Sequence, residues 1–512
     1  MSCLARPAAA PRRPVAGGPL AVMACAALML TAGSGLLFIG GVAWAEEADL
    51  RGANQLELYY DTALEESLVD DRLDIDLTWN RFSAGVVFLS HTPSDPRLDP
   101  NKYGIRQEGI RKRWVGAKHG PVEARLGDSY ATLGSGMVLM IYEDKTIDFD
   151  NVVDGAHIRA ELGRFDFEGI AGTNSYGRPA TIVKGLAARS DLGKGWSVVA
   201  NGALVDSVFG DEPRPGRDGI AGLQGTARLP GGIDLKGEYA IRHYSPERKG
   251  RRSPADGHGG YFAANASVGR VAFLVEGKDL LRFAHAYGIP PTVVRQHTTT
   301  LLNRGSHVPN IRLDDERGIQ TEVMINPSPA LSFTGNWSRS YARHADLPAW
   351  EVVGEAEADW IGTHWILRAG ETEEKVREGS DRVFFERITY GGDAQRSFGP
   401  WAIEVGYETQ ATQKQDLATS RFEWPVEYRD QVATVSLTRA PRHSWSVTTE
   451  WSDEPNLDRE SWFWAEWRIR LGLLGQLTVA GGSLRGGQVC SGGVCKIVDP
   501  FEGGRLELLT NF

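Results

Sequence analysis

Apolar and polar residues alternate with a period of two along much of this 512-residue chain. The segment 73–79 reads Leu-Asp-Ile-Asp-Leu-Thr-Trp, and the segment 401–408 reads Trp-Ala-Ile-Glu-Val-Gly-Tyr-Glu. Because successive side chains of a strand point to opposite faces, each such segment has one apolar and one polar face. A water-soluble β-sandwich would give the same alternation. The segments, however, run for about 9–11 residues, which is the length a tilted strand needs to cross a bilayer.

The connections between these segments alternate between short and long. Short ones include Asn80–Phe82 and Gly163–Arg164, whereas Thr92–Glu108, Ser129–Asp154 and Asp279–Glu316 are long. Short turns on one rim and long loops on the other are typical of outer-membrane barrels. We therefore predict an all-β fold, a transmembrane antiparallel up-and-down β-barrel of about 24 strands (22–26), with periplasmic turns and extracellular loops. The barrel must close, because an open sheet edge in hydrocarbon would leave backbone groups without partners.

The first 45 residues have the order of a secretory signal peptide. Three arginines precede an apolar run from Pro19 to Val42, and the tripeptide Ala43-Trp44-Ala45 then offers a cleavage site. This pattern predicts a cleaved signal peptide over residues 1–45 and a barrel over residues 46–512 in the outer membrane of a Gram-negative-type bacterium. A retained membrane anchor is the alternative, since the apolar run is long enough to span.

The formal net charge of −10 argues against a nucleic-acid binder, which would need a basic face. The chain has no His-Glu-x-x-His, Gly-x-Ser-x-Gly or Walker motif, so we expect no enzyme, cofactor or metal centre. Serine and histidine residues from different strands could still assemble a hydrolytic site. Cleavage of the signal peptide would leave two cysteines, Cys490 and Cys495, whose spacing suits a disulfide across a glycine turn in an oxidising compartment. A zinc site would need two further ligands.

At the end of the chain, Leu506, Leu508, Thr510 and Phe512 share one face of a strand. This segment resembles the closing strand of bacterial outer-membrane barrels. The resemblance implies that Phe512 is read by the barrel-insertion machinery. Outer-membrane lipid and that machinery are the partners we expect.

A distinctive segment runs from Arg125 to Asp144 and reads Arg-Leu-Gly-Asp-Ser-Tyr-Ala-Thr-Leu-Gly-Ser-Gly-Met-Val-Leu-Met-Ile-Tyr-Glu-Asp. Its Gly-Asp-x-Tyr, Gly-x-Gly and Tyr-Glu elements resemble an uncharacterised family of bacterial outer-membrane proteins, described only as a domain of unknown function. The later stretch Arg-Gly-Gly-Gln-Val-Cys-Ser-Gly-Gly-Val-Cys at residues 485–495 carries the same resemblance. The resemblance implies a barrel fold and supplies no activity.

The apolar run Met137–Ile141 lies within the long connection at residues 129–154. An apolar loop should avoid water, so we expect this one to fold into the lumen, as in loop-plugged barrels. Its acids would then form a cation-favouring constriction: Glu143, Asp144, Asp148, Asp150 and Asp154. An ordinary external hairpin with solvated acids is the alternative. Calcium binding by Asp148, Asp150 and Asp154 is a further one, although the spacing does not complete an EF-hand.

Alternation also places charged residues on the polar face, which would line the lumen: Asp74, Asp76, Glu355, Glu357, Asp359, Glu404, Glu408, Arg468 and Arg470. The two arginines could balance the acids. We predict a porin-like channel for small hydrophilic, preferentially cationic, solutes. The alternative is a non-conducting barrel that acts as a binding or assembly scaffold, with long loops such as Asp279–Glu316 docking a partner protein.

Overall fold

The computed structural model describes the chain from residue 48 onward, with gaps between the following ranges: 48–62, 65–93, 108–145, 149–174, 181–207, 216–246, 255–295, 297, 299–305, 315–342, 347–378, 381–417, 425–455, 457–491, 494–498 and 500–512. The predicted signal peptide therefore lies outside the described residues. Residues 50–512 form one compact unit. No helix among the described residues is long and apolar enough to cross a membrane.

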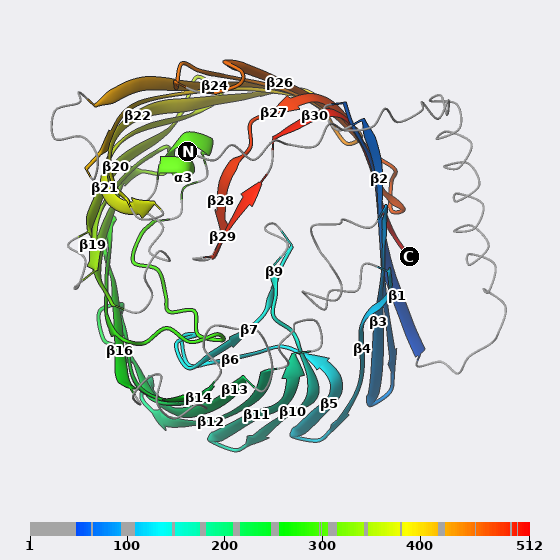
Figure 1. Ribbon diagram of the computed structural model, residues 1–512, viewed down its shortest axis with the longest axis vertical. Helices are drawn as coiled ribbons and strands as arrows, with labels where there is room; N and C mark the ends of the chain where they lie inside the picture. The colour runs from blue at the N-terminus through cyan, green and yellow to red at the C-terminus, as the bar shows by residue number, and fades with distance from the viewer. Residues whose placement is uncertain are drawn as a thin grey trace, which may run out of the picture. The chain divides into compact units, whose positions relative to one another are not determined.

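Twenty-four strands form a single antiparallel sheet that closes on itself. Each strand pairs with the next barrel strand along the chain, and β1 (Ala48–Asp61) pairs with β30 (Phe501–Asn511). In the closing pair, Ala53 lies opposite Asn511 and Leu58 opposite Leu506. Viewed along its axis, the sheet is a ring (Figure 1). The predicted fold class and strand number are confirmed.

The remaining barrel strands are β2 (Glu66–Trp79), β3 (Phe82–Thr92), β4 (Glu108–His119), β5 (Val122–Ser129), β10 (Val153–Leu162), β11 (Phe165–Asn174), β12 (Thr181–Gly193), β13 (Trp196–Ser207), β14 (Gly216–Leu229), β15 (Ile233–Pro246), β16 (Ala255–Val268), β17 (Val271–Leu281), β18 (Glu316–Ser328), β19 (Leu331–Ala342), β20 (Leu347–Trp360), β21 (Thr363–Glu378), β22 (Asp381–Phe398), β23 (Trp401–Asp416), β24 (Val426–Arg439), β25 (His443–Ser452), β26 (Ser461–Arg470) and β27 (Gly475–Leu484). Short elements in the connections are β6 (Ala131–Leu133), β7 (Leu139–Ile141), β8 (Glu143–Asp144), β9 (Phe149–Asp150), α3 (Thr300–Gly305), β28 (Gly487–Ser491) and β29 (Val494–Val498).

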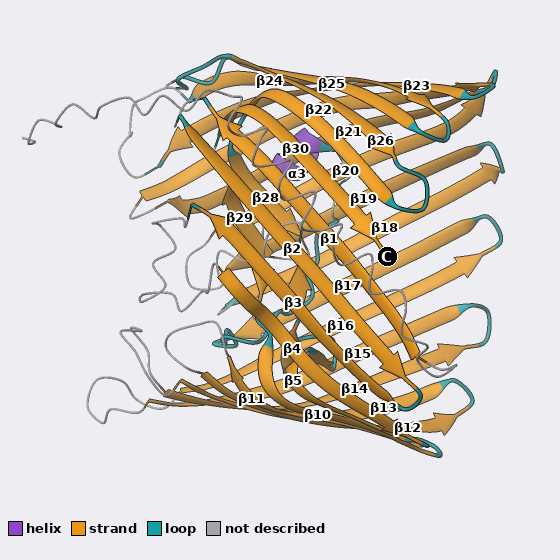
Figure 2. Ribbon diagram, turned by 90° about the vertical axis from the view of Figure 1, so that its right-hand side faces the viewer, coloured by secondary structure: helices purple, strands orange, loops and turns teal. Residues whose placement is uncertain are grey.

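Short turns join the strands along one rim, and the strand ends that the longer connections join lie at the other (Figure 2). The connection between β21 and β22 is an exception on that second rim, since only residues 379 and 380 separate the two strands. The turn between β20 and β21 contains only Ile361 and Gly362, with φ values of 53° and 71°. Positive φ at both central residues matches the twist of a two-residue hairpin. The alternation of short and long connections in the sequence therefore corresponds to the two rims of the barrel.

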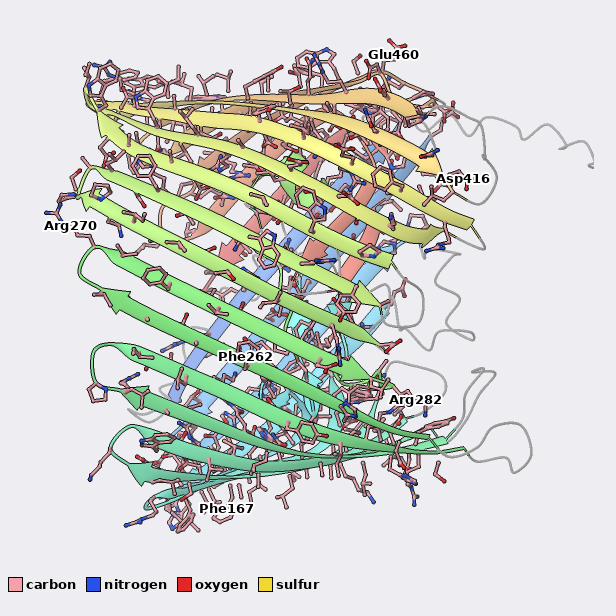
Figure 3. All side chains as sticks on the ribbon, turned by 90° about the vertical axis from the view of Figure 1, so that its left-hand side faces the viewer. Phe167, Phe262, Arg270, Arg282, Asp416 and Glu460 are labelled. Carbon is pink, nitrogen blue, oxygen red and sulfur yellow. The ribbon has the colours of Figure 1, made fainter. Side chains whose placement is uncertain are left out.

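The two faces of the wall differ as the period of two requires. On β19, Asn336, Ser338 and Ser340 point inward and are buried, whereas Trp337 is exposed on the outside. Outward side chains elsewhere are mostly large and apolar, including Phe167 and Phe262 (Figure 3). Such a surface suits contact with hydrocarbon.

Candidate functional site in the lumen

Three connections carry elements that lie inside the ring of strands (Figure 1). The first lumen loop, residues 130–152, contains β6 to β9. The second lumen loop, residues 282–315, contains α3, and the third lumen loop, residues 485–500, contains β28 and β29. Together they cover parts of the inner wall.

Apolar contacts hold the first lumen loop against the wall. Met137, Val138 and Leu139 have no exposed surface, and they share a buried cluster with the inward side chains of β10 to β17, among them Val183 and Ile220. Burial of each such side chain contributes about 1.5–3 kcal/mol relative to exposure. The inner wall is therefore apolar where this loop covers it, which alternation alone did not predict.

The Gly134-Ser135-Gly136 motif forms a hydrogen-bonded contact between the first lumen loop and the inner wall. The Glu238 carboxylate on β15 accepts hydrogen bonds from the backbone N–H of Ser135, at 2.7 Å, and from the Ser135 hydroxyl group. Gly134 has a φ of +70°, and a Cβ atom there would overlap Glu238 and Asn201. The motif thus requires glycine for the close approach of the loop to the wall.

Ion pairs attach the β8–β9 hairpin to a different part of the wall. Glu143 lies 2.7 Å from Arg72 on β2 and 2.8 Å from Lys112 on β4, and Lys112 lies 2.9 Å from Asp150. Burial alone would raise the pKa of Glu143, but hydrogen bonds from Arg72 and Lys112 outweigh it and lower the pKa to about 2. The hairpin is therefore held by charged groups at neutral pH.

These ion pairs reduce the net negative charge of the predicted constriction. Glu143 and Asp150 have basic partners, so they do not stand as free carboxylates. Asp144 lies opposite Phe149 in the β8–β9 hairpin, and Asp154 lies on β10, 3.9 Å from Arg113. Asp148 is outside the described residues. No group of three or more metal-ligating side chains occurs in the described part of the chain.

The second lumen loop joins the first directly. The Met140 N–H donates to the Tyr287 carbonyl oxygen at 2.7 Å, and the Ile289 N–H donates to the Gly136 carbonyl oxygen at 3.0 Å. The His285 Nε2 lies 2.9 Å from the Met137 carbonyl oxygen. Burial lowers the pKa of His285 to about 4, so its neutral ring donates this hydrogen bond at neutral pH.

From this junction the second lumen loop continues along the inner wall. His297 lies 2.8 Å from Glu351, and Arg295 lies 2.9 Å from Glu355, both on β20. Glu408 on β23 accepts hydrogen bonds from the backbone N–H groups at the start of α3, at 2.7 and 3.1 Å. The described residues of the connection Asp279–Glu316 therefore line the inner wall, and the docking of a partner protein by this connection stays a prediction. Apolar residues such as Phe283 and Leu301 gain more by burial in the lumen.

The third lumen loop shares an anchor with the second. Arg485 lies 2.6 Å from Asp430, 3.1 Å from Glu450 and 2.7 Å from Glu454. Arg304 of the second loop contacts the same Glu450 at 2.6 Å. Three connections far apart in sequence therefore form one linked lining along the inner wall.

In the third loop, strands β28 and β29 form a hairpin. Their backbone register places Cys490 directly opposite Cys495. The predicted disulfide between them stays a prediction.

The predicted wall residues fall into two groups. Glu355 and Glu408 bind the second loop, Asp74 lies 3.0 Å from Arg72, Asp359 lies 2.9 Å from His364, and Arg468 pairs with Glu466. The second group has no ion-pair partner among the described residues: Asp76, Glu357 and Glu404. Arg470 contributes its backbone N–H to the Arg442 carbonyl oxygen.

Sequence reasoning missed the basic residues that fix the loops, namely Lys112, Arg295, Arg304 and Arg485. Each of them binds a carboxylate that belongs to a different segment of the chain. The sequence around Lys112 gives no signal for its orientation, because Arg111, Lys112 and Arg113 are consecutive and the strand has a register shift at this point. Even where alternation does indicate an inward side chain, it does not identify the partner of that side chain.

Comparison with known proteins gives one family match. A model described as a family of unknown function (DUF6029) matches residues 59–201. This range contains the first of the two distinctive motifs, together with the first lumen loop. The predicted likeness to a family of unknown function is confirmed for this part of the chain. A search of curated proteins finds no matching sequence.

Several solved structures are similar to this chain at low identity. The P pilus usher (PapC) translocation pore is 9% identical, with 91% of this chain and 99% of that chain covered and a TM-score of 0.44. The FrpB iron transporter from Neisseria meningitidis (F3-3 variant) is 10% identical, with coverage of 91% and 81% and a TM-score of 0.45. The outer membrane protein opdK from Pseudomonas aeruginosa is 11% identical, with coverage of 75% and 100% and a TM-score of 0.38.

Proposed function

We propose that the protein is an outer-membrane channel that passes small hydrophilic solutes through a lumen narrowed by the three lumen loops, with a preference for cations. The observation that carries this proposal is a closed barrel whose outer face is apolar and whose inner face is largely polar. In this placement the short turns face the periplasm and the long connections face outward. The proposal includes no catalytic step.

The cation preference rests on three inward carboxylates, Asp76, Glu357 and Glu404, which have no ion-pair partner among the described residues. Asp76 and Glu404 are exposed, so water in the lumen can solvate them. Uncompensated acidic side chains on a pore wall raise the local concentration of cations and exclude anions. The paired acids of the β8–β9 hairpin would contribute less, because Lys112 and Arg72 neutralise them.

The test is a reversal-potential measurement in planar bilayers under a potassium chloride gradient. We expect the purified barrel to be cation-selective, and the combined variant Asp76→Asn, Glu357→Gln and Glu404→Gln to shift the reversal potential toward zero. Glu371→Gln is the matched control. Glu371 points outward from β21, because its neighbour Thr372 is buried on the inner face. Removal of the Glu371 charge should therefore leave the selectivity unchanged. Anion selectivity of the unmodified barrel would contradict the cation preference.

The lining of the lumen also favours a second function, a non-conducting barrel that serves as a scaffold for a partner protein. Loops tied to the wall by several ion pairs restrict the open cross-section. Absence of current from correctly folded, membrane-inserted barrels would favour this function over the channel. Current through the unmodified barrel would exclude it.

A further inference from the structure

The charge on the short-turn rim contrasts with the acidic character of the whole chain. The eleven short turns between barrel strands contain five basic residues and no acidic residue. The five are Arg81, Arg164, Lys194, Arg270 and Arg442. All five are exposed, and Arg270 projects at this rim in Figure 3. None of them forms an ion pair with a described acidic residue.

Acidic residues near the same rim lie on the other side of the wall. Asp166, Asp234 and Asp359 occupy inward positions on β11, β15 and β20, opposite in parity to the outward residues Phe167, Leu235 and Trp360. Lumenal acids and rim cations are therefore segregated. The rim cations are free to meet a negatively charged surface outside the barrel.

Exposed aromatic side chains sit beside these cations. Phe82 follows Arg81, Phe165 follows Arg164, and Trp196 lies two residues after Lys194, and each of the three rings is about half exposed on the outer face. On the far side of the barrel, Trp401, Trp445 and Trp467 stack at centroid distances of 6.2 and 6.4 Å, and the guanidinium of Arg439 lies 5.5 Å from the Trp401 ring.

Aromatic rings mark the level of the lipid headgroups, because their amphipathic character suits that zone. The turn cations therefore lie beside the headgroups of the leaflet that surrounds the short-turn rim. We propose that this rim binds anionic phospholipid, with the phosphate groups recognised by the turn cations and the glycerol and acyl region contacted by the neighbouring rings. A phosphodiester is the ligand chemistry that exposed arginine recognises best. The inference rests on the membrane placement in the proposed function.

Quenching of tryptophan fluorescence by brominated phospholipids tests it. The full barrel is reconstituted in phosphatidylcholine bilayers that contain either brominated phosphatidylglycerol or brominated phosphatidylcholine. The relative binding constant of phosphatidylglycerol divided by that of phosphatidylcholine, called the lipid ratio below, should exceed one. The triple variant Arg81→Gln, Arg164→Gln and Lys194→Gln should lower the lipid ratio several-fold, since each cation near an anionic surface contributes a factor of about five at low salt.

The control is the double variant Arg282→Gln and Arg429→Gln. It removes two exposed arginines, Arg282 at the opposite rim (Figure 3) and Arg429 near the start of β24. Its lipid ratio should equal that of the unmodified barrel. A lipid ratio of one for the unmodified barrel, an unchanged lipid ratio in the triple variant, or an equal fall in the control would each overturn the proposal.

Should the triple variant fail to fold, a salt titration of the unmodified barrel tests the same lipid preference. The lipid ratio should fall between about 0.05 and 0.5 M sodium chloride as screening increases, and a salt-independent lipid ratio would overturn the proposal. Currents in pure phosphatidylcholine bilayers report on the channel separately. Failure of the proposed function would therefore be distinguishable from failure of the lipid preference.

Discussion

Gly134 of the first lumen loop lies against the carboxylate of Glu238 on the inner wall, with no space for a side chain between them. The same carboxylate accepts both hydrogen bonds of Ser135. The Gly-x-Gly motif of this chain is therefore a docking element that fixes a loop inside the barrel. It has no strand-to-helix context of the kind that nucleotide-binding glycine motifs require.

Substitution of Gly134 by alanine should release this part of the first lumen loop. A Cβ atom would overlap Glu238, and alanine would also have to adopt a φ of +70°, at a cost of about 1–3 kcal/mol. We expect a larger single-channel conductance in planar bilayers. Gly163→Ala is the matched control, because Gly163 has a φ of +69° but no neighbouring atom within 4 Å of the added Cβ. Equal conductance in both variants would contradict the role of Gly134 in holding the loop against the wall.

Attachment of the β8–β9 hairpin should depend on acid pH. The pKa of Glu143 falls from its ordinary value of 4.5 to about 2 in the folded protein. A lowered carboxyl pKa means that the stabilisation is complete above about pH 4.5 and is lost as the pH falls toward about 2. Conductance recorded across this window should change in the unmodified barrel. The change should be reduced in Glu143→Gln, which has no titrating group at this position; an identical profile would refute the role of Glu143.

The junction between the first and second lumen loops should also weaken as the pH falls, in a window that lies above that of Glu143. The pKa of His285 falls from 6.5 to about 4, because burial disfavours the charged ring. Its stabilising effect is therefore complete above about pH 6.5 and decreases as the pH falls toward about 4. The protection factors of the Met140 and Ile289 amides, obtained from hydrogen–deuterium exchange after correction for the intrinsic pH dependence of exchange, should fall in that interval. His285→Gln should abolish the pH response, whereas His243→Gln, which alters an exposed histidine, should retain it.

Glu450 should be the most sensitive anchor, because it binds arginines from two loops. We expect Glu450→Gln to lower the free energy of unfolding by about 3 kcal/mol, the lower end of the range for an uncompensated buried charge, since Arg485 keeps Asp430 and Glu454. Urea unfolding in lipid vesicles measures this difference. Asp234→Asn is the control, since its pair with Arg228 is exposed and contributes about 0–1 kcal/mol.

Cys490 and Cys495 should be linked in protein isolated from an oxidising compartment, as their opposed backbone positions allow. Mass spectrometry after alkylation should show both thiols blocked only when a reductant is added first. Labelling of both thiols without reduction would exclude the bond.

The barrel could be predicted because the features that indicate it, alternation and the lengths of connections, are local in the sequence. Leu73, Ile75 and Leu77 face outward for the same reason that any strand alternates, and the lengths of the connections assign them to a rim. Closure follows from the lack of backbone partners in hydrocarbon. Strand number, direction and the pairing of the last strand with the first therefore need no knowledge of distant contacts.

The lumen lining depends on contacts that no local pattern contains. The segment Met137–Ile141 could be recognised as an apolar loop from the sequence. The two partners of Glu143, Arg72 and Lys112, could not, because they lie on separate strands earlier in the chain. Likewise, Glu450 meets Arg304, which is 146 residues away in the chain. Pairing of inward charges is set by loop paths through three dimensions, and alternation gives only the side of the wall on which each charge lies.

The pairing of β1 with β30 makes the earliest and latest strands of the sheet neighbours. Because β30 is the last of these strands along the chain, the sheet cannot close before β30 has been synthesised. Until then the edges of β1 and β27 have unpaired backbone groups, which are a template for pairing with another chain.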